Sequence, residues 1–446
     1  MSTIKLVVSD LHLADGSPIL DCFGESQQSA FTGLLHAATS ENGPLVQAAA
    51  VELIINGDCF DFLVTSPYAQ QRVTDEATAL EKIEKIIAAH APFFADLRSF
   101  VAIPGRSVTF LTGNHDPELC FAKVRARICQ DLVGKENDSK IYFCPTRSYR
   151  PLPDVCIEHG NHYDPWNRDP LSLWDEHGQP LLTDPPSLLL PMGTWYYQLV
   201  TNLISVRYPF IDHFEPALSH TRQIGLLCLL DPPLLLEMAQ LTMQMLPSPR
   251  KALANLAPGE EQMPVRLFEE AMLDFVAFRQ AMFAQLSAAQ PQEQASDQIS
   301  PEDFMEYMLV HEALTLPHLE ALTAICTPAA QGADSTSQGM YAVLNQNPAL
   351  RYAIAGHTHT LCIDPINQGQ QVYLNTGSWV ARYAQPAPGE LTPALADWLH
   401  APDWDNIPLR DVTQLPFTLI TVDNGPASAS LCVWEGGSHG HYRVLA

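Results

Sequence analysis

The chain is poor in positive charge. Its 446 residues carry 24 lysine and arginine side chains against 50 aspartate and glutamate side chains, a formal net charge of −26. Such a surface repels the phosphate backbone of nucleic acids and the anionic head groups of lipids. We therefore expect no extended nucleic-acid surface. The negative charge does not exclude a local binding pocket centred on metal ions.

Two other features are missing. The ten cysteines form no C-x-x-C pair and no cluster, which indicates small buried side chains in a reducing compartment. No segment reaches the roughly 18 apolar residues of a membrane span, because Asp231 and Glu237 interrupt the leucine-rich stretch Leu226–Leu246. The run Ile4–Val8 leads straight into Asp10 and is typical of a core strand rather than a signal peptide. We expect a soluble, cytoplasmic protein with no transmembrane segment.

What is present is a globular composition, with 46% hydrophobic residues, and a change of pattern along the chain. In the first 165 residues or so, short apolar runs alternate with helical spacing, as in Asp75–His90. Strands that alternate with helices predict a layered α/β fold. The predicted strands of this part are Ile4–Val8, Val51–Ile55, Ser107–Leu111 and Val155–Glu158.

From about Asp169 to Asn347, helical periodicity replaces the short strands. The best helical pattern is Val265–Ala288, a polar linker follows at Ala289–Ile299, and Ser300 begins another helix as its N-cap. The last hundred residues return to strands. These predicted strands are Arg351–Ala355, Gln371–Asn375, Phe417–Val422 and Ser428–Trp434.

Five short patches of metal-binding side chains each follow one of the predicted strands. Rigid strands that end at one sheet edge can bring such side chains together from distant parts of a chain. The pair at i and i+2 in two of the patches would point the same way from an extended segment. The patches are Asp10-Leu11-His12, Gly57-Asp58 with Asp61, Gly113-Asn114-His115-Asp116, His159-Gly160 and Gly356-His357-Thr358-His359.

These patches predict metal-assisted hydrolysis. A two-metal hydrolase needs a bridging carboxylate, neutral imidazoles and an open position for a water, which becomes a hydroxide near neutral pH and attacks phosphorus in line. Because one domain must hold all five patches, residues 1–168 and 348–446 are predicted to form a discontinuous domain. Residues 169–347 would be a helical insertion that serves as a lid, an oligomerisation surface or a substrate-binding element.

The ordered set of patches resembles the calcineurin-like metallophosphoesterase superfamily. The resemblance covers residues 1–165 and 350–385 and is closest to the bacterial branch that includes UDP-2,3-diacylglucosamine pyrophosphohydrolases. It implies an α/β fold, a four-layer α-β-β-α metallophosphoesterase sandwich with the large helical insertion added. It also implies two divalent metal ions, manganese first, with iron, zinc, nickel or magnesium as alternatives.

The resemblance assigns roles to individual residues. Asp58 would bridge the two metals, His115 would face the phosphate and assist the leaving group, and Asp116 would orient His115. The first metal would be held by Asp10, His12, Asp58 and His359, and the second by Asp58, Asn114, His159 and His357.

Several assignments stay open at this point. His162 could replace His159 as a ligand, although His159 directly follows a strand. His162 and Asn167 line the mouth of the site or belong to a solvated loop, and Arg382 binds substrate phosphate or is a solvated turn residue. Asp61 is expected to contact a ligand or cap a helix rather than bind metal.

The predicted function is that of a di-metal-dependent phosphoric ester hydrolase, acting on a phosphomonoester, phosphodiester or pyrophosphate. Two alternatives differ in class. One is a non-catalytic metal-containing scaffold that binds a protein partner through the insertion, and the other is a nuclease of the same superfamily, which the negative charge disfavours. The insertion could also mediate a homo-oligomer.

Overall fold

The computed structural model describes residues 3–169 except 18–19, 40–44, 46–47 and 67–72, parts of 173–215, then 334–384, 398, 403 and 406–445 except 424. It has two compact units. The first comprises Met1–Gln198, Ala333–Ala381 and Thr413–Ala446, and the second Leu199–Gly332 and Arg382–Val412. The first unit thus continues past residue 168 as far as Gln198. The expected helices at Val265–Ala288 and from Ser300, and the linker between them, lie outside the described residues.

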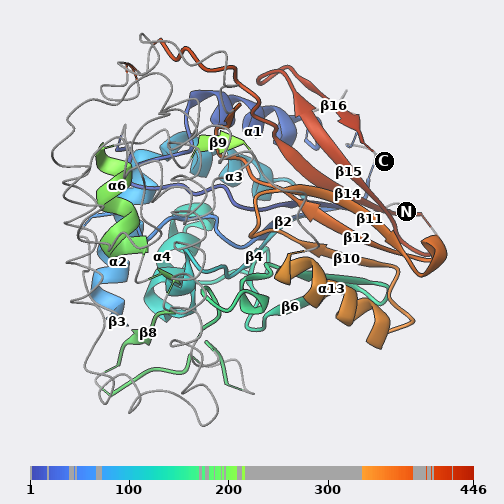
Figure 1. The fold of residues 1–446 in the computed structure, drawn as a ribbon, viewed down its shortest axis with the longest axis horizontal. Helices are drawn as coiled ribbons and strands as arrows, with labels where there is room; N and C mark the ends of the chain where they lie inside the picture. Colours follow the sequence, from blue (N-terminus) through green and yellow to red (C-terminus); the bar gives the residue numbers. More distant parts are fainter. Residues whose placement is uncertain are drawn as a thin grey trace, which may run out of the picture. The chain divides into compact units, whose positions relative to one another are not determined.

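A seven-stranded mixed sheet forms one half of the first unit, in the order β16-β15-β14-β1-β2-β4-β5 (Figure 1). Strands β1, β2 and β4 run parallel, so their carboxyl ends lie at the same edge. Their near-continuous apolar sequences suit strands that are covered on both faces. The strands are β1 (Thr3–Val8), β2 (Ala50–Asn56), β4 (Arg106–Leu111), β5 (Ile141–Phe143), β14 (Pro416–Val422), β15 (Ser428–Glu435) and β16 (His441–Val444).

A five-stranded mixed sheet forms the other half, in the order β11-β12-β10-β7-β6. Here β7, β10 and β12 are parallel. With the first sheet, it confirms the α/β class and all eight strands predicted from the apolar runs. The strands are β6 (Ser148–Leu152), β7 (Val155–Glu158), β10 (Tyr352–Ala355), β11 (Leu361–Ile366) and β12 (Gln371–Thr376).

Local signals set the helix ends. Asp75 caps α2 by accepting a hydrogen bond of 2.8 Å from the backbone N–H of Thr78, as expected for the predicted helix there. Gly134 ends α4 in the left-handed conformation, with φ of 70°. The helices are α1 (Glu25–Ala37), α2 (Glu76–Ala89), α3 (Ala91–Ala102), α4 (Ala122–Val133) and α13 (Ser335–Gln346), with short 3₁₀ turns at Pro117–Cys120, Asn161–Tyr163 and Asn367–Gly369.

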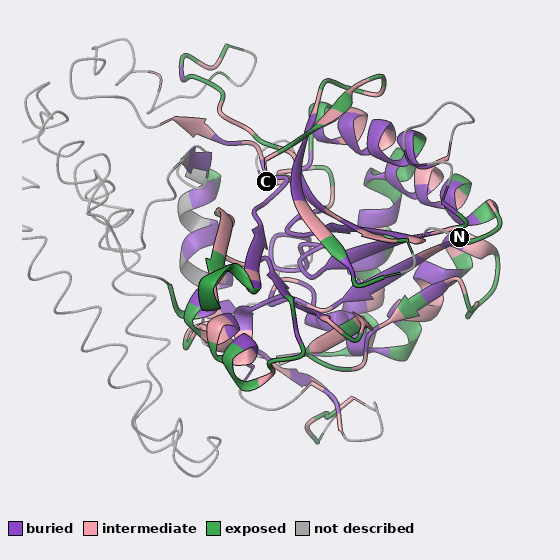
Figure 2. Cartoon of the chain, turned by 90° about the vertical axis from the view of Figure 1, so that its right-hand side faces the viewer, coloured by how far each residue is buried: buried purple, intermediate pink, exposed green. Residues whose placement is uncertain are grey.

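Alternate residues of the strands feed different hydrophobic clusters. Leu6 and Leu53 pack with residues of α1 to α4, whereas Val7 and Ile54 pack with the five-stranded sheet. A third cluster joins α13 to that sheet through residues such as Met340. Figure 2 shows most of these strands coloured as buried. Burial on both faces fixes the strand register, and so it fixes where each strand ends.

Short elements occur where only helices were expected. β8 (Leu188–Leu189) pairs with β3 (Val73–Thr74), and β9 (Phe214–Glu215) pairs with β13 (Tyr383–Ala384). The expectation that strands vanish after residue 169 is therefore wrong at these two places, because two-residue strands leave no periodicity in a sequence. A π-helix at Tyr197–Thr201 and α6 (Asn202–Arg207) follow β8.

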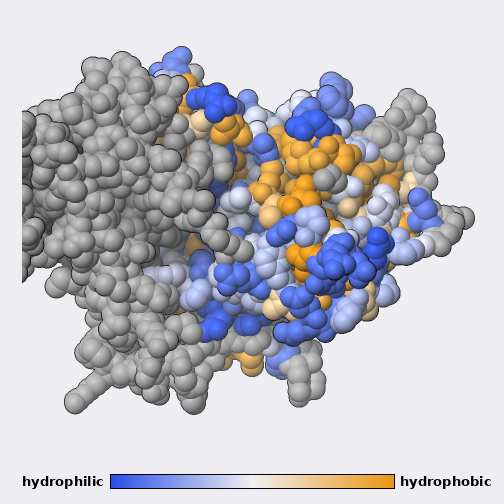
Figure 3. All heavy atoms as spheres, turned by 45° about the vertical axis from the view of Figure 1, so that its right-hand side comes forward, coloured by the Kyte–Doolittle hydropathy of each residue, from blue (hydrophilic) through white to orange (hydrophobic). Residues whose placement is uncertain are grey.

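The described surface and thiols add two observations. Figure 3 shows a band of hydrophobic side chains bordered by hydrophilic ones on the face that it draws. The cysteines within the described residues are all free thiols, and most of them are buried. None of the described helices combines the length and the hydropathy needed to cross a membrane.

Candidate metal centre

Five parallel strands deliver the candidate ligands to one place in the first unit. Asp10, Asp58 and Asn114 follow β1, β2 and β4, while His159 and His357 follow β7 and β10 of the other sheet. Backbone hydrogen bonds tie the strand ends together. The N–H of Asp10 donates to Gly57 over 3.2 Å, and the N–H of Gly356 donates to His159 over 3.0 Å.

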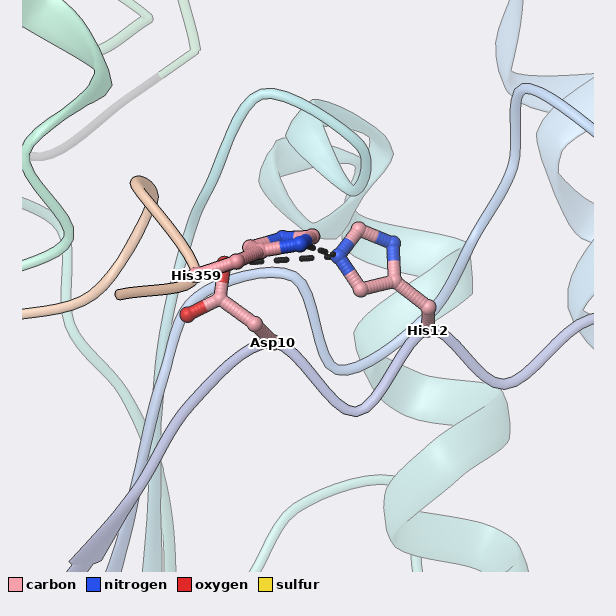
Figure 4. A group of neighbouring side chains, drawn as sticks. All are labelled: Asp10, His12 and His359. Atoms are coloured by element: carbon pink, nitrogen blue, oxygen red, sulfur yellow. Dashed lines mark hydrogen bonds and ion pairs between the residues drawn. The ribbon is translucent and has the colours of Figure 1, made fainter. Parts of the chain in front are cut away.

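The first candidate group consists of Asp10, His12 and His359, whose ligand atoms all lie within 4.8 Å of one another (Figure 4). The Nε2 atoms of His12 and His359 are 3.1 Å apart. The Nε2 atom of His359 lies 3.2 Å from Oδ1 of Asp10. Two imidazole nitrogens and one carboxylate oxygen facing one point are suitable ligands for a divalent metal.

The second candidate group consists of Asp58, His159 and His357. Nε2 of His159 lies 3.1 Å from Oδ2 of Asp58 and 3.3 Å from Oδ1 of Asn114. Its Nδ1 is 2.8 Å from the carbonyl oxygen of Asn56, which only accepts, so Nδ1 carries the hydrogen. Nε2 is then the nitrogen with a lone pair for a metal.

Asp58 connects the two groups. Its Oδ2 atom lies 3.1 Å from Nε2 of His159 in the second group and 3.9 Å from Nε2 of His12 in the first. Its Oδ1 atom accepts a hydrogen bond of 2.8 Å from the backbone N–H of His115. One buried carboxylate thus faces both groups, as a bridging ligand must.

Five candidate ligands have strained backbones. The φ angles are 56° at Asp10, 53° at His12, 50° at Asp58, 68° at His357 and 57° at His359. Only a few per cent of non-glycine residues have positive φ, and each such residue costs of order 1–3 kcal/mol. The expectation that Asp10-x-His12 and His357-x-His359 project from extended segments is wrong, because left-handed turns aim these side chains instead.

Three motif glycines leave space for the ligands. A Cβ atom at Gly113 would collide with the carboxylate of Asp58, and one at Gly57 would collide with the imidazole of His159. A Cβ atom at Gly356 would lie 2.5 Å from Oδ2 of Asp10. Glycine is therefore required at these positions, because a larger side chain would occupy the space beside the donor atoms.

The negative charges of the buried carboxylates in the centre are balanced by neighbouring imidazoles. Burial alone would raise the pKa of Asp58, but the positive charge of His159 holds it well below its usual range. Burial lowers the pKa of His159, but the charge of Asp58 outweighs burial and raises that pKa to about 10. Among the described residues, neither Asp10 nor Asp58 forms an ion pair with lysine or arginine. This cluster suits cations that replace the imidazole protons.

His115 pairs with Asp61 and not with its neighbour Asp116. Its Nδ1 atom lies 3.0 Å from Oδ2 of Asp61. The expected contact with Asp116 is corrected, because that carboxylate turns to the backbone and accepts hydrogen bonds from the N–H groups of Gly113 (2.7 Å) and Cys59 (2.8 Å). Burial lowers the pKa of His115, but the charges of Asp61 and Asp58 outweigh it and raise that pKa to about 9.

Asp61 contacts a ligand as expected, but it closes a turn and caps no described helix. Oδ2 lies 3.1 Å from Nδ1 of His12, and Oδ1 accepts the backbone N–H groups of Leu63 (3.0 Å) and Val64 (3.3 Å). His12, Asp61 and His115 also form a third group whose atoms could hold a metal. Since Asp61 already fills both oxygens with hydrogen bonds, its geometry is that of a residue that orients two imidazoles.

Two of the three predicted substrate-binding residues, His162 and Asn167, pair with acidic side chains. Nε2 of His162 lies 3.1 Å from Glu158, and His162 belongs to none of the metal groups. Asn167 donates a 2.7 Å hydrogen bond to Oδ2 of Asp164, which lies 3.1 Å from Nε2 of His357. Arg382 belongs to the second unit.

Asp164 is the residue that sequence reasoning missed as a partner of a ligand. Nothing in its spacing from His159 distinguishes an acid that orients a ligand from an acid of a solvated loop. The 3₁₀ turn Asn161–Tyr163 carries it round toward His357. Such a turn cannot be recognised from apolar periodicity.

Comparison with known proteins adds no relatives. A scan against protein-family models gives no match, and a search of curated proteins gives none either. The chemistry of the site is therefore inferred from the side chains described above and from their geometry.

Proposed function

We propose that the protein is a di-metal-dependent phosphoric ester hydrolase. The single observation that carries the proposal is the position of Asp58, whose one carboxylate faces both candidate groups. The strained backbone at five of the ligands supports it, because strain is retained where a site requires it. The scaffold and nuclease alternatives have no comparable support from a specific contact.

The donor set suits two divalent ions of intermediate hardness. Carboxylate, amide and imidazole donors fit manganese first, with iron, zinc, nickel or magnesium as alternatives. A softer site would need a thiolate, but burial raises the pKa of the nearby Cys59 thiol well above its ordinary value. Asp10, His12 and His359 would hold the first ion, and Asn114, His159 and His357 the second, with Asp58 between them.

Residues of the chain itself would orient the proton donor and protonate the leaving oxygen. The metal pair, when bound, supplies Lewis acidity that lowers the pKa of a water and polarises a phosphoryl oxygen. Asp61 accepts the Nδ1 hydrogen of His115, which leaves Nε2 to face the substrate. From Nε2, His115 would donate a proton to the leaving oxygen. In the metal-free protein, the pKa of about 9 keeps this imidazole protonated at neutral pH.

We also propose that the first unit is a four-layer α-β-β-α metallophosphoesterase sandwich. Its support is the succession of hydrophobic clusters, in which α1 to α4 pack on one sheet and α13 packs on the other. The residues between the first and second of the three parts of this unit would form the helical insertion. That insertion remains a proposal, since most of its residues lie outside those described.

The test is a substrate panel with defined metal content. The apoprotein is loaded with manganese, zinc or iron and assayed on aryl phosphomonoesters, phosphodiesters and pyrophosphate esters. We expect turnover of at least one class, and about two metals per chain. Asp58→Asn should abolish turnover and reduce metal content, whereas Asp423→Asn, at an exposed turn, should change neither. A metal-loaded protein that cleaves no substrate would overturn the proposal.

A further inference from the structure

The segment that follows β8 contacts the loops that carry the site. The backbone N–H of Gly193 donates to the carbonyl of Trp166 over 2.7 Å. The buried hydroxyl of Thr194 donates to the carbonyl of Asn114 over 3.3 Å. A Cβ atom at Gly193 would lie 2.6 Å from Oδ1 of Asn167, so the close approach requires glycine. This segment is therefore fixed to the loops of the candidate metal centre by one backbone and one side-chain hydrogen bond.

Tyr197 lies at the end of this segment, beside His115. The ring centroids of the two residues are 5.1 Å apart, with an interplanar angle of 74°, an edge-to-face contact. Another edge-to-face contact joins His115 to His12, at 4.6 Å and 85°. Among the described residues, the imidazole of His115 thus has two ring neighbours and one carboxylate partner, Asp61.

A single hydrogen bond does not fix the plane of an imidazole. The bond between Nδ1 of His115 and Asp61 fixes one atom and leaves the ring free to tilt about that contact. Two edge-to-face contacts restrict the tilt, and aromatic pairs contribute about 0.5–1.5 kcal/mol beyond their buried area. The direction of Nε2, the atom that would donate the proton, therefore depends on Tyr197 as well as on Asp61.

Tyr197 is itself held in place. It packs against a small cluster of Ala14, Leu20 and Val64. It also begins a π-helical turn, Tyr197–Thr201, a form that is rare and frequent at functional sites. Ala14 and Val64 of this cluster lie close in sequence to the patches at 10–12 and 58–61. Movement of either loop would therefore change the packing against the Tyr197 ring.

We propose that Tyr197 is a positioning residue that fixes the orientation of the His115 imidazole. The proposal rests on the hydrolase function proposed above and deepens it. The ring of Tyr197, and not its hydroxyl, supplies the edge-to-face contact, so phenylalanine should replace it and an aliphatic residue should not. Tyr197 acts only through His115, so its effect should vanish when that imidazole is absent.

The experiment compares Tyr197→Leu, Tyr197→Phe and the packing control Leu344→Ala, a buried residue of α13 that belongs to a different cluster, in the metal-loaded full chain. We expect Tyr197→Leu to lower kcat by about twofold to tenfold with KM and metal content unchanged. Tyr197→Phe should keep the wild-type kcat, and Leu344→Ala should lower thermal stability but not kcat. In a His115→Asn background, Tyr197→Leu should have no further effect.

A second measurement separates this proposal from the function on which it rests. The imidazole resonances of His115, identified by their loss in His115→Asn, are recorded by NMR with zinc bound. They should shift in Tyr197→Leu more than in Tyr197→Phe or Leu344→Ala, whether or not a substrate is known. Equal kcat losses in Tyr197→Leu and Leu344→Ala, or unshifted His115 resonances, would overturn the positioning role. Absence of all turnover with shifted resonances would overturn only the hydrolase function.

Discussion

His12 and His115 contact the same oxygen atom of Asp61. The Nδ1 atoms of the two imidazoles lie 3.1 Å and 3.0 Å from Oδ2 of that carboxylate. One imidazole is a candidate metal ligand and the other is the candidate proton donor. Asp61 therefore sets the tautomer of both rings, with each Nδ1 carrying a hydrogen and each Nε2 directed away from Asp61.

Asp61→Asn should move the pH dependence of turnover. The charge of Asp61 raises the pKa of His115, so its removal lets that pKa fall. A proton donor works only below its own pKa, and the loss of activity at high pH should therefore begin at a lower pH in the variant. We expect kcat to drop by about 10² or more. A profile of kcat against pH checks both effects.

Asp116→Asn provides the contrast. Asp116 contacts backbone N–H groups and not His115, so the alkaline limit of the profile should stay where it is in the wild type. The variant should lose about 1–3 kcal/mol of unfolding free energy, because an amide satisfies those buried N–H groups less well than a carboxylate does. If Asp116→Asn shifts the profile as much as Asp61→Asn, the assignment of Asp61 is wrong.

Asp164→Asn should weaken the second metal site. Asp164 lies 3.1 Å from His357 and is held by Asn167. Loss of a carboxylate that orients a metal-ligating histidine typically costs 10–100-fold in metal affinity. Competition titration with a chelator would measure this loss. Asp138→Asn, which removes a carboxylate that accepts a hydrogen bond from the backbone N–H of Lys140 and contacts Lys135, should leave affinity unchanged.

Metal binding should strengthen as the pH rises. His159 can bind a metal only when its Nε2 atom has lost its proton, and its pKa in the metal-free protein is about 10. Between pH 6 and 9, metal affinity should therefore increase with pH. Metal at 100 times its Kd should add about 2.7 kcal/mol to the unfolding free energy. Thermal unfolding with and without a chelator at several pH values tests this, and a pH-independent shift would contradict it.

Glu118→Gln should stabilise the protein at alkaline pH. Burial raises the pKa of Glu118 from 4.5 to about 7, and its Oε2 atom has no hydrogen-bond partner among the residues that the structure describes. An acid with a raised folded-state pKa costs nothing below pH 4.5, and its penalty grows until the pH passes 7. The gain in Glu118→Gln should thus be near zero at pH 4 and reach up to about 3 kcal/mol at pH 8. Chemical denaturation at both pH values measures it, and a gain equal at both would rule out this origin.

The sequence predicted the strands and the ligand patches well, for a physical reason. Strands buried on both faces require continuous apolar runs, and parallel strands place the residues that follow them at one edge. This is why Asp10, Asp58 and His357 could be assigned to one site before any coordinates were known.

The rest depends on contacts that leave no local pattern. Asp116 precedes a 3₁₀ turn that directs it toward Gly113 and Cys59, so adjacency to His115 was misleading. The positive φ angles at the non-glycine ligands accompany hydrogen bonds between distant segments, such as those from the backbone N–H groups of Asp10 to Gly57 and of His12 to Asp58, and residue type alone does not predict them. Tyr197 contacts His115 from a segment far along the chain. It begins a π-helix, which no apolar repeat in the sequence predicts.

The glycine at position 113 makes the centre vulnerable in an unusual way. All the donor groups would still be present in Gly113→Ala. The added methyl group would nevertheless displace the carboxylate of Asp58, which lies between the two candidate groups. Inactivation by Gly113→Ala would thus come from added volume, with all the acids and imidazoles intact. A natural variant of this kind would keep the complete set of candidate ligands in its sequence and yet lose the position of the carboxylate that lies between the two candidate groups.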